Sequence, residues 1–421
     1  MRVYLRTFGC RANHYDSETA RAMIERAGHD LTSDVGEADV AVFNSCAVTA
    51  EAEADLRSAV RRAARSRPAL RTVIMGCATG LAARTESASL RSLPSVEHLV
   101  DGADMASLAA ALELPHDASL ARATAQTSVR ALLRIQDGCD EHCTFCATTL
   151  ARGDSRSRSA HDIAAEARVL AEHHPEIVIT GIHIGSYGLD IGSSLGELVE
   201  HLVRDVPRVR FRLSSVEATE VDDRLFTLLV GEPARVAPHL HAPLQSGSDA
   251  VLKRMGRHWY SAERYARSVE RLVASRPVFG LGADVIVGFP GETEADHART
   301  VALLERLPFT YLHVFPYSVR PGTAAEKLGG RVQSLIVADR ARELRELAAR
   351  KAAAYRAKRA GSVADVVVVR GGPNSTEREG MTEDYLTVLP TGASLPRASR
   401  FAARLLLAES KLIATPLAPS P

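Results

Sequence analysis

Three cysteines crowd into eight positions of the stretch IQDGCDEHCTFCATTLARG, residues 135–153: Cys139, Cys143 and Cys146. This spacing suits a loop wrapped around one metal centre, because thiolates hold iron–sulfur clusters, usually four to a cluster. Zinc also takes four ligands, and His142 is a candidate for the fourth. Zinc loops usually have two-residue gaps on both sides, however, and no second cysteine pair follows here. The spacing therefore favours an iron–sulfur cluster.

The chain has three further cysteines, Cys10, Cys46 and Cys77, and none after residue 146. A disulfide framework belongs to short secreted chains, whereas this chain has 421 residues. An electron carrier with two four-iron clusters would need eight cysteines, and this chain has two sets of three. Three thiolates on a four-iron cluster leave one iron open for a ligand or substrate.

The elements expected around the first set explain how it could assemble. Strands are predicted over residues 2–9, 38–45 and 71–76, with helices over 15–28 and 51–66. Strands that alternate with helices predict a parallel sheet, and sites in such sheets form beyond the carboxyl ends of the strands. Each predicted strand leads into a cysteine, so we expect the three thiols to converge. The alternative is three small buried core residues.

The rest of the chain divides into two further regions. Six candidate strands between residues 131 and 318, with helical patterns between them, predict a partial or complete parallel α/β barrel. One helix is expected over 334–360, followed by a small β module with strands over 363–370 and 383–390. Residues 414–421 are expected to be a disordered tail. The predicted fold class is therefore α/β with a small C-terminal β module.

Composition adds few constraints. The chain is long enough for two or three domains, has no apolar run of 18 residues, and begins without the apolar stretch of a signal peptide. We therefore expect a cytoplasmic protein without a membrane span. The formal net charge is +1, and arginine far outnumbers lysine throughout. Only local clusters of arginine can then indicate nucleic-acid binding.

The C-x3-C-x2-C loop, with Phe145 before its last cysteine, resembles that of the radical S-adenosylmethionine superfamily. The resemblance implies that the open iron chelates the amino and carboxylate groups of S-adenosylmethionine. Electron transfer then cleaves this cofactor to a 5′-deoxyadenosyl radical. It also implies that Phe145 lies near the adenine of the cofactor.

A narrower resemblance covers nearly the whole chain. The segments TFGCRANHYDSE, NSCAVTAEAEAD, MGCATG, RFRLSSVE, HLHAPLQSGSDAVLKRMGR and DVIVGFPGETEAD resemble motifs of the methylthiotransferases. The implied organisation is an N-terminal domain with an auxiliary cluster (1–115), a radical barrel (125–355) and a TRAM-like RNA-binding module (361–413). The implied cofactors are two [4Fe-4S] clusters, one on each set of cysteines, and S-adenosylmethionine.

Three branches of that family differ in substrate. The segments VITGIHIGSYGLD, RVRFRLSSVEATE and HVFPYSVRPGTAA look most like the branch that acts on N6-threonylcarbamoyladenosine at tRNA position 37. The other branches act on isopentenyladenosine in tRNA and on a ribosomal-protein aspartate. A non-catalytic iron–sulfur RNA-binding protein is an alternative of a different class. The segment ATTLARGDSRSRS departs from relatives, which carry a bulkier, proline-containing sequence there.

The resemblance also implies that the two clusters have different roles. The cluster on Cys139, Cys143 and Cys146 reduces one S-adenosylmethionine, and the resulting radical removes hydrogen from C2 of the adenine ring. The cluster on Cys10, Cys46 and Cys77 presents sulfur, and a second S-adenosylmethionine supplies the methyl group. A flavodoxin- or ferredoxin-type protein is the expected one-electron reductant. Both open irons must then face one cavity, because the sulfur must reach the carbon that loses hydrogen.

Other side chains are weaker candidates. Ser215 and Gln245 lie near predicted strand ends and are candidate cofactor contacts, although satisfaction of the backbone would explain them equally well. Arg152, Arg156 and Arg158 form a basic patch beside the cysteine loop and are candidate contacts to tRNA phosphates or the cofactor carboxylate. His239 and His241 share one face of a strand and are expected to line the barrel.

Overall fold

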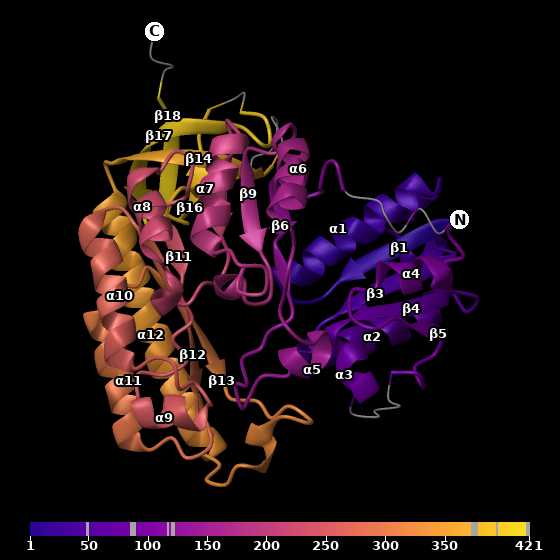
Figure 1. The fold of residues 1–421 in the computed structure, drawn as a ribbon, viewed down its shortest axis with the longest axis horizontal. Coiled ribbons are helices and arrows are strands. Elements are labelled where there is room, and N and C mark those ends of the chain that lie inside the picture. Colours follow the sequence, from indigo (N-terminus) through magenta and orange to yellow (C-terminus); the bar gives the residue numbers. More distant parts are fainter. Residues whose placement is uncertain are drawn as a thin grey trace.

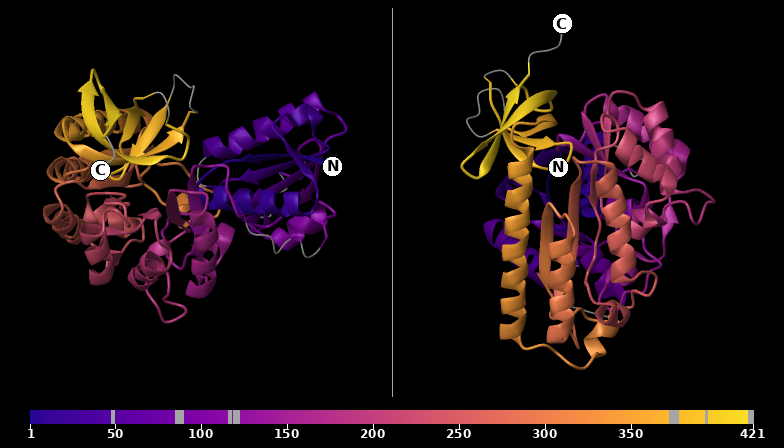
Figure 2. Two further views of the ribbon diagram at one scale, coloured as in Figure 1. Left: turned by 90° about the horizontal axis from the view of Figure 1, so that it is seen from above. Right: turned by 90° about the vertical axis from the view of Figure 1, so that its left-hand side faces the viewer.

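The computed structural model describes residues 1–47, 50–84, 90–115, 118, 123–371, 378–392 and 395–417. Within these residues, an N-terminal sheet, a central barrel and a small C-terminal barrel follow one another along the chain (Figure 1). The N-terminal sheet and its helices lie beside a central barrel, and a small closed barrel lies at one end of it (Figure 2). None of the described helices combines the length and apolar character needed to cross a membrane.

The N-terminal sheet is parallel throughout and has the order β2-β1-β3-β4-β5. All six residues of β3 are buried, as expected for a parallel strand covered on both faces. The strands are β1 (Arg2–Thr7), β2 (Asp30–Thr32), β3 (Val40–Ser45), β4 (Arg71–Gly76) and β5 (Val96–Leu99). The helices are α1 (Arg11–Arg26), α2 (Ala50–Ser66), α3 (Cys77–Arg84) and α4 (Met105–Ala111).

The three predicted strands of this region are therefore present, and β2 and β5 are two short strands that the sequence did not indicate. The predicted helix over 15–28 begins earlier, at Arg11. Its start follows Cys10 at once, and no side chain caps it, so the usual polar start signal is missing. Gly28 ends it at a φ of 75°, the left-handed conformation that glycine adopts readily.

The central region is a six-stranded partial barrel. Strands β6, β9 and β10 form one parallel sheet, and β11, β12 and β13 form another. Parallel bridges from Phe211 to Val236 and from Ser215 to His241 join β10 to the β11 segment. All six predicted strands are confirmed: β6 (Arg130–Arg134), β9 (Glu176–Thr180), β10 (Arg210–Leu213), β11 (His239–His241), β12 (Gly280–Val287) and β13 (Tyr311–Pro316).

Helices cover the outside of this barrel and enclose the largest apolar core of the molecule. They are α6 (Ala160–Ala171), α7 (Leu195–Asp205), α8 (Asp223–Gly231), α10 (Ala262–Ser275) and α11 (Glu294–Arg306). The cysteine loop between β7 (Gln136–Asp137) and α5 (Thr148–Arg152) lies on the side of the N-terminal sheet, where α5 packs against α3. The helix α12 (Ser334–Arg359) runs along the barrel to the C-terminal module and confirms the predicted long helix (Figure 2).

The C-terminal module is a closed barrel in the order β14-β15-β16-β18-β17. Its strands are β14 (Val363–Arg370), β15 (Glu379–Thr382), β16 (Thr387–Pro390), β17 (Arg400–Ala408) and β18 (Lys411–Pro416). The strand predicted over 383–390 begins only at Thr387, because a turn with Tyr385 at a φ of 70° precedes it. The predicted disordered tail was wrong for residues 414–416, which pair in β18 and bury Ala414; residues 418–421 lie outside the described part.

A buried ion cluster joins the C-terminal module to the central barrel. The carboxylate of Glu176 accepts hydrogen bonds from Arg210 and Arg212, and all three side chains are fully buried. Arg212 also donates to the backbone oxygens of Thr382 and Glu383. The strands β9 and β10 are thereby connected to the turn after β15.

We predict that Glu176→Ala lowers the free energy of unfolding by about 3–5 kcal/mol, because two buried guanidinium groups lose their carboxylate. Urea unfolding followed by circular dichroism measures this change. Glu200→Ala is the matched control, because Glu200 forms an exposed ion pair with Arg224 and should change stability by less than about 1 kcal/mol. Equal losses for the two variants would contradict the importance of the buried cluster.

Candidate functional site

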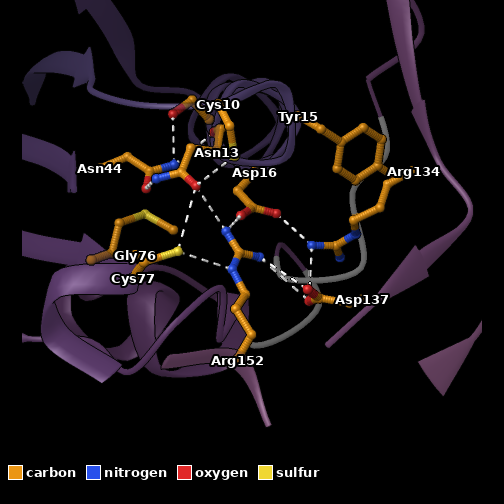
Figure 3. A network of polar contacts seen from close by, with 12 residues as sticks. Cys10, Asn13, Tyr15, Asp16, Asn44, Gly76, Cys77, Arg134, Asp137 and Arg152 are labelled. Carbon is orange, nitrogen blue, oxygen red and sulfur yellow. Dashed lines mark hydrogen bonds and ion pairs between the residues drawn. The ribbon is translucent and has the colours of Figure 1, made fainter. Parts of the chain in front are cut away.

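The first set of cysteines gathers at the carboxyl ends of three strands, as the predicted sheet required. Cys46 and Cys77 follow β3 and β4 directly, whereas Cys10 lies three residues beyond β1. The Oδ1 atom of Asn13 accepts from Cys10 Sγ at 3.6 Å and from Cys77 Sγ at 3.7 Å (Figure 3). Gly9, at a φ of 107°, lies so close to Cys46 that an added Cβ would be 2.7 Å from the Cys46 Cβ.

Asn13 holds these loops together. It lies on α1, is fully buried, and its Nδ2 donates to the backbone oxygens of Phe8 and Ser45 at 3.1 and 2.6 Å. The same nitrogen lies 3.2 Å from Oδ1 of Asn44. One amide side chain therefore connects the loops after β1 and β3 to two of the thiols. The sequence analysis did not single out Asn13, although it lies within the first cysteine motif.

The second set of cysteines lies in the loop between β7 and α5. The backbone N–H of Cys146 donates to the oxygen of Cys143 at 3.1 Å, which makes the loop turn tightly. Nη1 of Arg257 donates to Cys143 Sγ at 3.3 Å, and Nδ1 of His183 lies 3.8 Å from Cys139 Sγ. The Arg257 guanidinium also pairs with Glu217. The loop is thus supported by side chains from the barrel.

The donor sets fit an iron–sulfur cluster better than a single zinc ion. Two thiolates on one zinc lie about 4 Å apart, given zinc–sulfur bonds of about 2.3 Å. In the described chain, the only group of three or more metal-binding side chains with all ligand atoms within 4.8 Å is His241, Asp284 and His313. Neither set of thiols is that compact, and the His142 side chain is exposed. Thiol ligands at wider spacing suit an iron–sulfur cluster, which contains several iron atoms.

Burial sets the charge state of these thiols. Burial raises the pKa of Cys77 to about 12, although hydrogen bonding to the cation Arg152 opposes the rise. Burial likewise raises the pKa of Cys143 to about 12, against the opposing charge of Arg257. Cys77 and Cys143, which must become thiolates to bind metal, therefore each already have a guanidinium group within hydrogen-bonding distance.

Both sets of cysteines open onto one cavity of about 250 Å³. Cys77 lines it from the first set and Cys146 from the second. The lining residues Cys77, Ala147 and Ala151 also belong, with Leu81, to an apolar cluster where α3 packs against α5. One thiol from each set therefore lines a common cavity; that two open irons face it stays a prediction.

Two of the three predicted cofactor contacts line this cavity. Phe145 and Gln245 both line it. The ring of Phe145 stands edge-on to Phe289, with centroids 6.3 Å apart, which fixes its orientation. Gln245 adopts a φ of 66°, unusual for a residue other than glycine, and its backbone bonds to Asp284 and Ile286. Ser215 is exposed at the end of β10 and is not among the residues that line the cavity.

The three predicted substrate arginines have separate surroundings. The Arg152 side chain is buried and donates to Asp16 at 2.8 Å, to Asn13 at 3.0 Å and to Cys77 Sγ at 3.2 Å (Figure 3). Arg158 is mostly buried and pairs with Glu166. Arg156 alone has an exposed side chain. This placement favours a structural role for Arg152 and Arg158. Of the three, only Arg156 has a side chain that is exposed and can contact a tRNA phosphate.

A polar group inside the barrel borders the same cavity. Nε2 of His241 and Nδ1 of His313 lie 3.1 and 3.2 Å from the same oxygen of Asp284, which lines the cavity. Burial opposes ionisation of Asp284, but the two histidine hydrogen bonds outweigh it and lower its pKa well below the usual range. His239 is buried and stacks on Tyr385, as expected for barrel lining.

We predict that Arg152→Met accelerates loss of iron from the first cysteine set to a chelator by about tenfold or more, because side chains that support metal ligands typically govern affinity by 10–100-fold. Chelator absorbance on the anaerobically reconstituted protein measures the rate. Arg156→Met is the matched control and should release iron at the parental rate, because its side chain is exposed. Identical rates for both variants would show that Arg152 does not support the site.

Comparisons with known proteins agree with this geometry. Residues 2–101 match the model of the uncharacterized protein family UPF0004, and residues 133–304 match that of the radical SAM superfamily. A threonylcarbamoyladenosine tRNA methylthiotransferase of Thermotoga maritima is 34% identical over 364 residues, 84% of this chain and 83% of the relative. A protein of the same name from Aquifex aeolicus is 33% identical over 93% of this chain and 97% of its own.

A second kind of relative is about equally similar. The tRNA-2-methylthio-N(6)-dimethylallyladenosine synthase of a Parafrankia species is 35% identical over 390 residues, 87% of this chain and 78% of the relative. The names of both groups of relatives denote methylthiolation of tRNA, and this chain contains the radical SAM domain, whose chemistry uses S-adenosylmethionine and [4Fe-4S] clusters. From its two matched domains and from relatives that align over most of their length, the chain belongs to the radical S-adenosylmethionine methylthiotransferase family.

Proposed function

We propose that this chain methylthiolates C2 of N6-threonylcarbamoyladenosine at position 37 of tRNA. The observation that supports this most directly is the cavity lined by Cys77 of one cysteine set and Cys146 of the other. Sulfur insertion needs a site for the sulfur and a site for carbon activation within reach of one substrate atom. The relatives from Thermotoga maritima and Aquifex aeolicus bear the name of this activity.

In this proposal the two cysteine sets hold two [4Fe-4S] clusters. Bound clusters and S-adenosylmethionine supply the electron, the hydrogen-abstracting radical, the sulfur and the methyl group. The residues of the chain hold and orient these groups: Asn13 and Arg152 support the first set, and Arg257 supports the second. Phe145 and Gln245 contact the cofactor from the cavity wall, and Ser215 is a more distant candidate.

The domain assignment follows from the same proposal. Residues 1–115 carry the auxiliary cluster, residues 125–355 form the radical barrel, and residues 361–413 form a TRAM-like RNA-binding module. The closed five-stranded barrel supports the last assignment, because small β-barrels often bind RNA. Arg156 is the proposed phosphate contact near the cavity. A flavodoxin- or ferredoxin-type protein would supply electrons, and a tRNA substrate places the reaction in the cytoplasm.

Isopentenyl-type adenosine in tRNA is the second candidate substrate. The observation in its favour is the 35% identity to the Parafrankia dimethylallyladenosine enzyme, which matches the identity to the threonylcarbamoyladenosine enzymes. Two charged side chains in an otherwise mainly apolar wall favour the first candidate, because Asp284 and Arg320 both line the cavity. An isopentenyl group offers such side chains no hydrogen bond, whereas a threonylcarbamoyl group offers several.

We predict that the anaerobically reconstituted protein, given reductant, S-adenosylmethionine and tRNA that lacks methylthio groups, produces 2-methylthio-N6-threonylcarbamoyladenosine. Mass spectrometry of the digested tRNA detects this nucleoside. A parallel reaction on isopentenyl-modified tRNA tests the second candidate. Cleavage of S-adenosylmethionine without either product would contradict the proposed tRNA substrates. Absence of this cleavage in protein that holds both clusters would contradict the proposed enzymatic activity.

Two cysteine variants separate the proposed roles in the same assay. Cys139→Ala should abolish S-adenosylmethionine cleavage, because it removes a ligand of the radical cluster. Cys10→Ala should retain cleavage but yield no methylthio product, because it disturbs only the sulfur-presenting cluster. Loss of all cleavage in Cys10→Ala, with the second cluster intact by iron analysis, would contradict separate roles.

A further inference from the structure

Arg320 is a buried cation without a carboxylate partner. Only 6% of the residue is exposed, and its guanidinium has one hydrogen bond in the described structure, from Nη2 to Ser318 Oγ at 3.3 Å. Seven arginines of the described chain are buried, and the other six each form an ion pair with an aspartate or glutamate. These six are Arg152, Arg210, Arg212, Arg257, Arg340 and Arg359.

Burial of Arg320 without a carboxylate partner has an energetic cost. A charge removed from water is destabilised unless an opposite charge or several hydrogen bonds replace the solvent. Burial accordingly lowers the pKa of the Arg320 guanidinium, although Glu53 and Cys46 oppose the change. Glu53 itself pairs with Arg57 at 2.5 Å. A partner for Arg320 is therefore expected from outside the described protein atoms.

A second polar group beside Arg320 also lacks a partner. The hydroxyl of Tyr317 is buried and has no hydrogen bond in the described structure. Burial raises the pKa of this phenol, so it stays a neutral donor. The ring stands edge-on to Phe289, with centroids 5.2 Å apart, and the backbone N–H of Tyr317 bonds to the oxygen of Val287. The hydroxyl is thus held in place without a partner of its own.

Both groups line the cavity between the two cysteine sets. They follow β13, and the same wall contains Cys77 and Cys146. Arg320 is the only cationic side chain among the residues that line the cavity in the described structure. The one acidic lining residue, Asp284, is already bonded to His241 and His313. Most of the remaining wall is apolar, which would strengthen a charge–charge contact by excluding water.

We propose that Arg320 and the Tyr317 hydroxyl bind the carboxylate of a ligand that enters this cavity. A guanidinium group presents parallel N–H donors that match the two oxygens of a carboxylate, and a phenol adds a third donor. This inference rests on the proposed function, which supplies two carboxylate ligands: the threonyl group of the modified adenosine and the methionyl group of S-adenosylmethionine. The shared chemistry is the carboxylate, and the experiment separates its two sources.

The experiment measures equilibrium dissociation constants on the full-length, anaerobically reconstituted protein. One pair of probes is S-adenosylmethionine and its decarboxylated form. The other pair is an anticodon stem-loop with threonylcarbamoyladenosine and the same stem-loop with the threonyl carboxylate converted to an uncharged amide. The variants are Arg320→Met, Arg320→Lys and Tyr317→Phe. Arg342→Met is the matched control, because Arg342 is exposed on α12.

We expect Arg320→Met to weaken binding of one carboxylate probe by about 10–100-fold, as for a lost charged hydrogen bond. The dissociation constant of the uncharged counterpart of that probe should change by less than about twofold. Arg320→Lys should lose less affinity than Arg320→Met, and Tyr317→Phe should weaken the same probe alone. Arg342→Met should leave every constant unchanged. Selective loss for the stem-loop identifies the substrate carboxylate, and selective loss for S-adenosylmethionine identifies the cofactor carboxylate.

The proposal is wrong if Arg320→Met changes neither carboxylate probe, or if it weakens a probe and its uncharged counterpart equally. Thermal unfolding separates misfolding from lost binding: removal of an unpaired buried charge should not lower the melting temperature, so a large decrease would also contradict the proposal. Failure of the parental protein to bind the modified stem-loop would count against the proposed tRNA substrate, while the S-adenosylmethionine pair would still decide the role of Arg320.

Discussion

The contact of Arg152 with Cys77, Asn13 and Asp16 is the interaction on which the site geometry depends (Figure 3). Arg152 ends the helix that follows the second cysteine loop, whereas its three partners belong to the N-terminal domain. One buried guanidinium therefore connects the two cysteine sets, which are more than 60 residues apart in sequence. Because a buried charge is costly without its partners, separation of the two regions is strongly disfavoured.

The rest of the fold supports that contact from both sides. Asn13 ties the loops after β1 and β3 to one another, so the position of α1 determines where the first set of thiols points. The barrel holds the second loop through Arg257, which is itself fixed by Glu217. The cavity between them is left with one unpaired cation, Arg320, in a mainly apolar wall. A site assembled from two domains in this way can hold two metal centres against one substrate atom.

The sequence predicted the parts of this arrangement that follow local rules. Strand–helix alternation located β1, β3 and β4 and all six strands of the central barrel. The cysteine spacing indicated one set of thiols, and the position of three cysteines after predicted strands indicated the other. The sequence could not show that Arg152 is buried, because an arginine beside a basic patch looks the same whether it contacts phosphate or Asp16. Asn13 was missed for a related reason, because it contacts residues far apart in sequence. Arg320 was missed because the sequence does not show that this arginine is buried without a carboxylate partner. Residues 414–416 of β18 were mistaken for part of a tail because the strand's alternation of buried and exposed residues is short and ends at a proline.

The central claim is that the two cysteine sets present their clusters to one cavity. Electron paramagnetic resonance of the fully reduced protein tests it most directly, with single-cluster variants that lack either Cys10, Cys46 and Cys77 or Cys139, Cys143 and Cys146 as references. Two reduced clusters at one cavity are close enough for magnetic coupling, so the parental spectrum should differ from the sum of the two single-cluster spectra. A parental spectrum equal to that sum would show that the clusters are distant and would contradict the shared site.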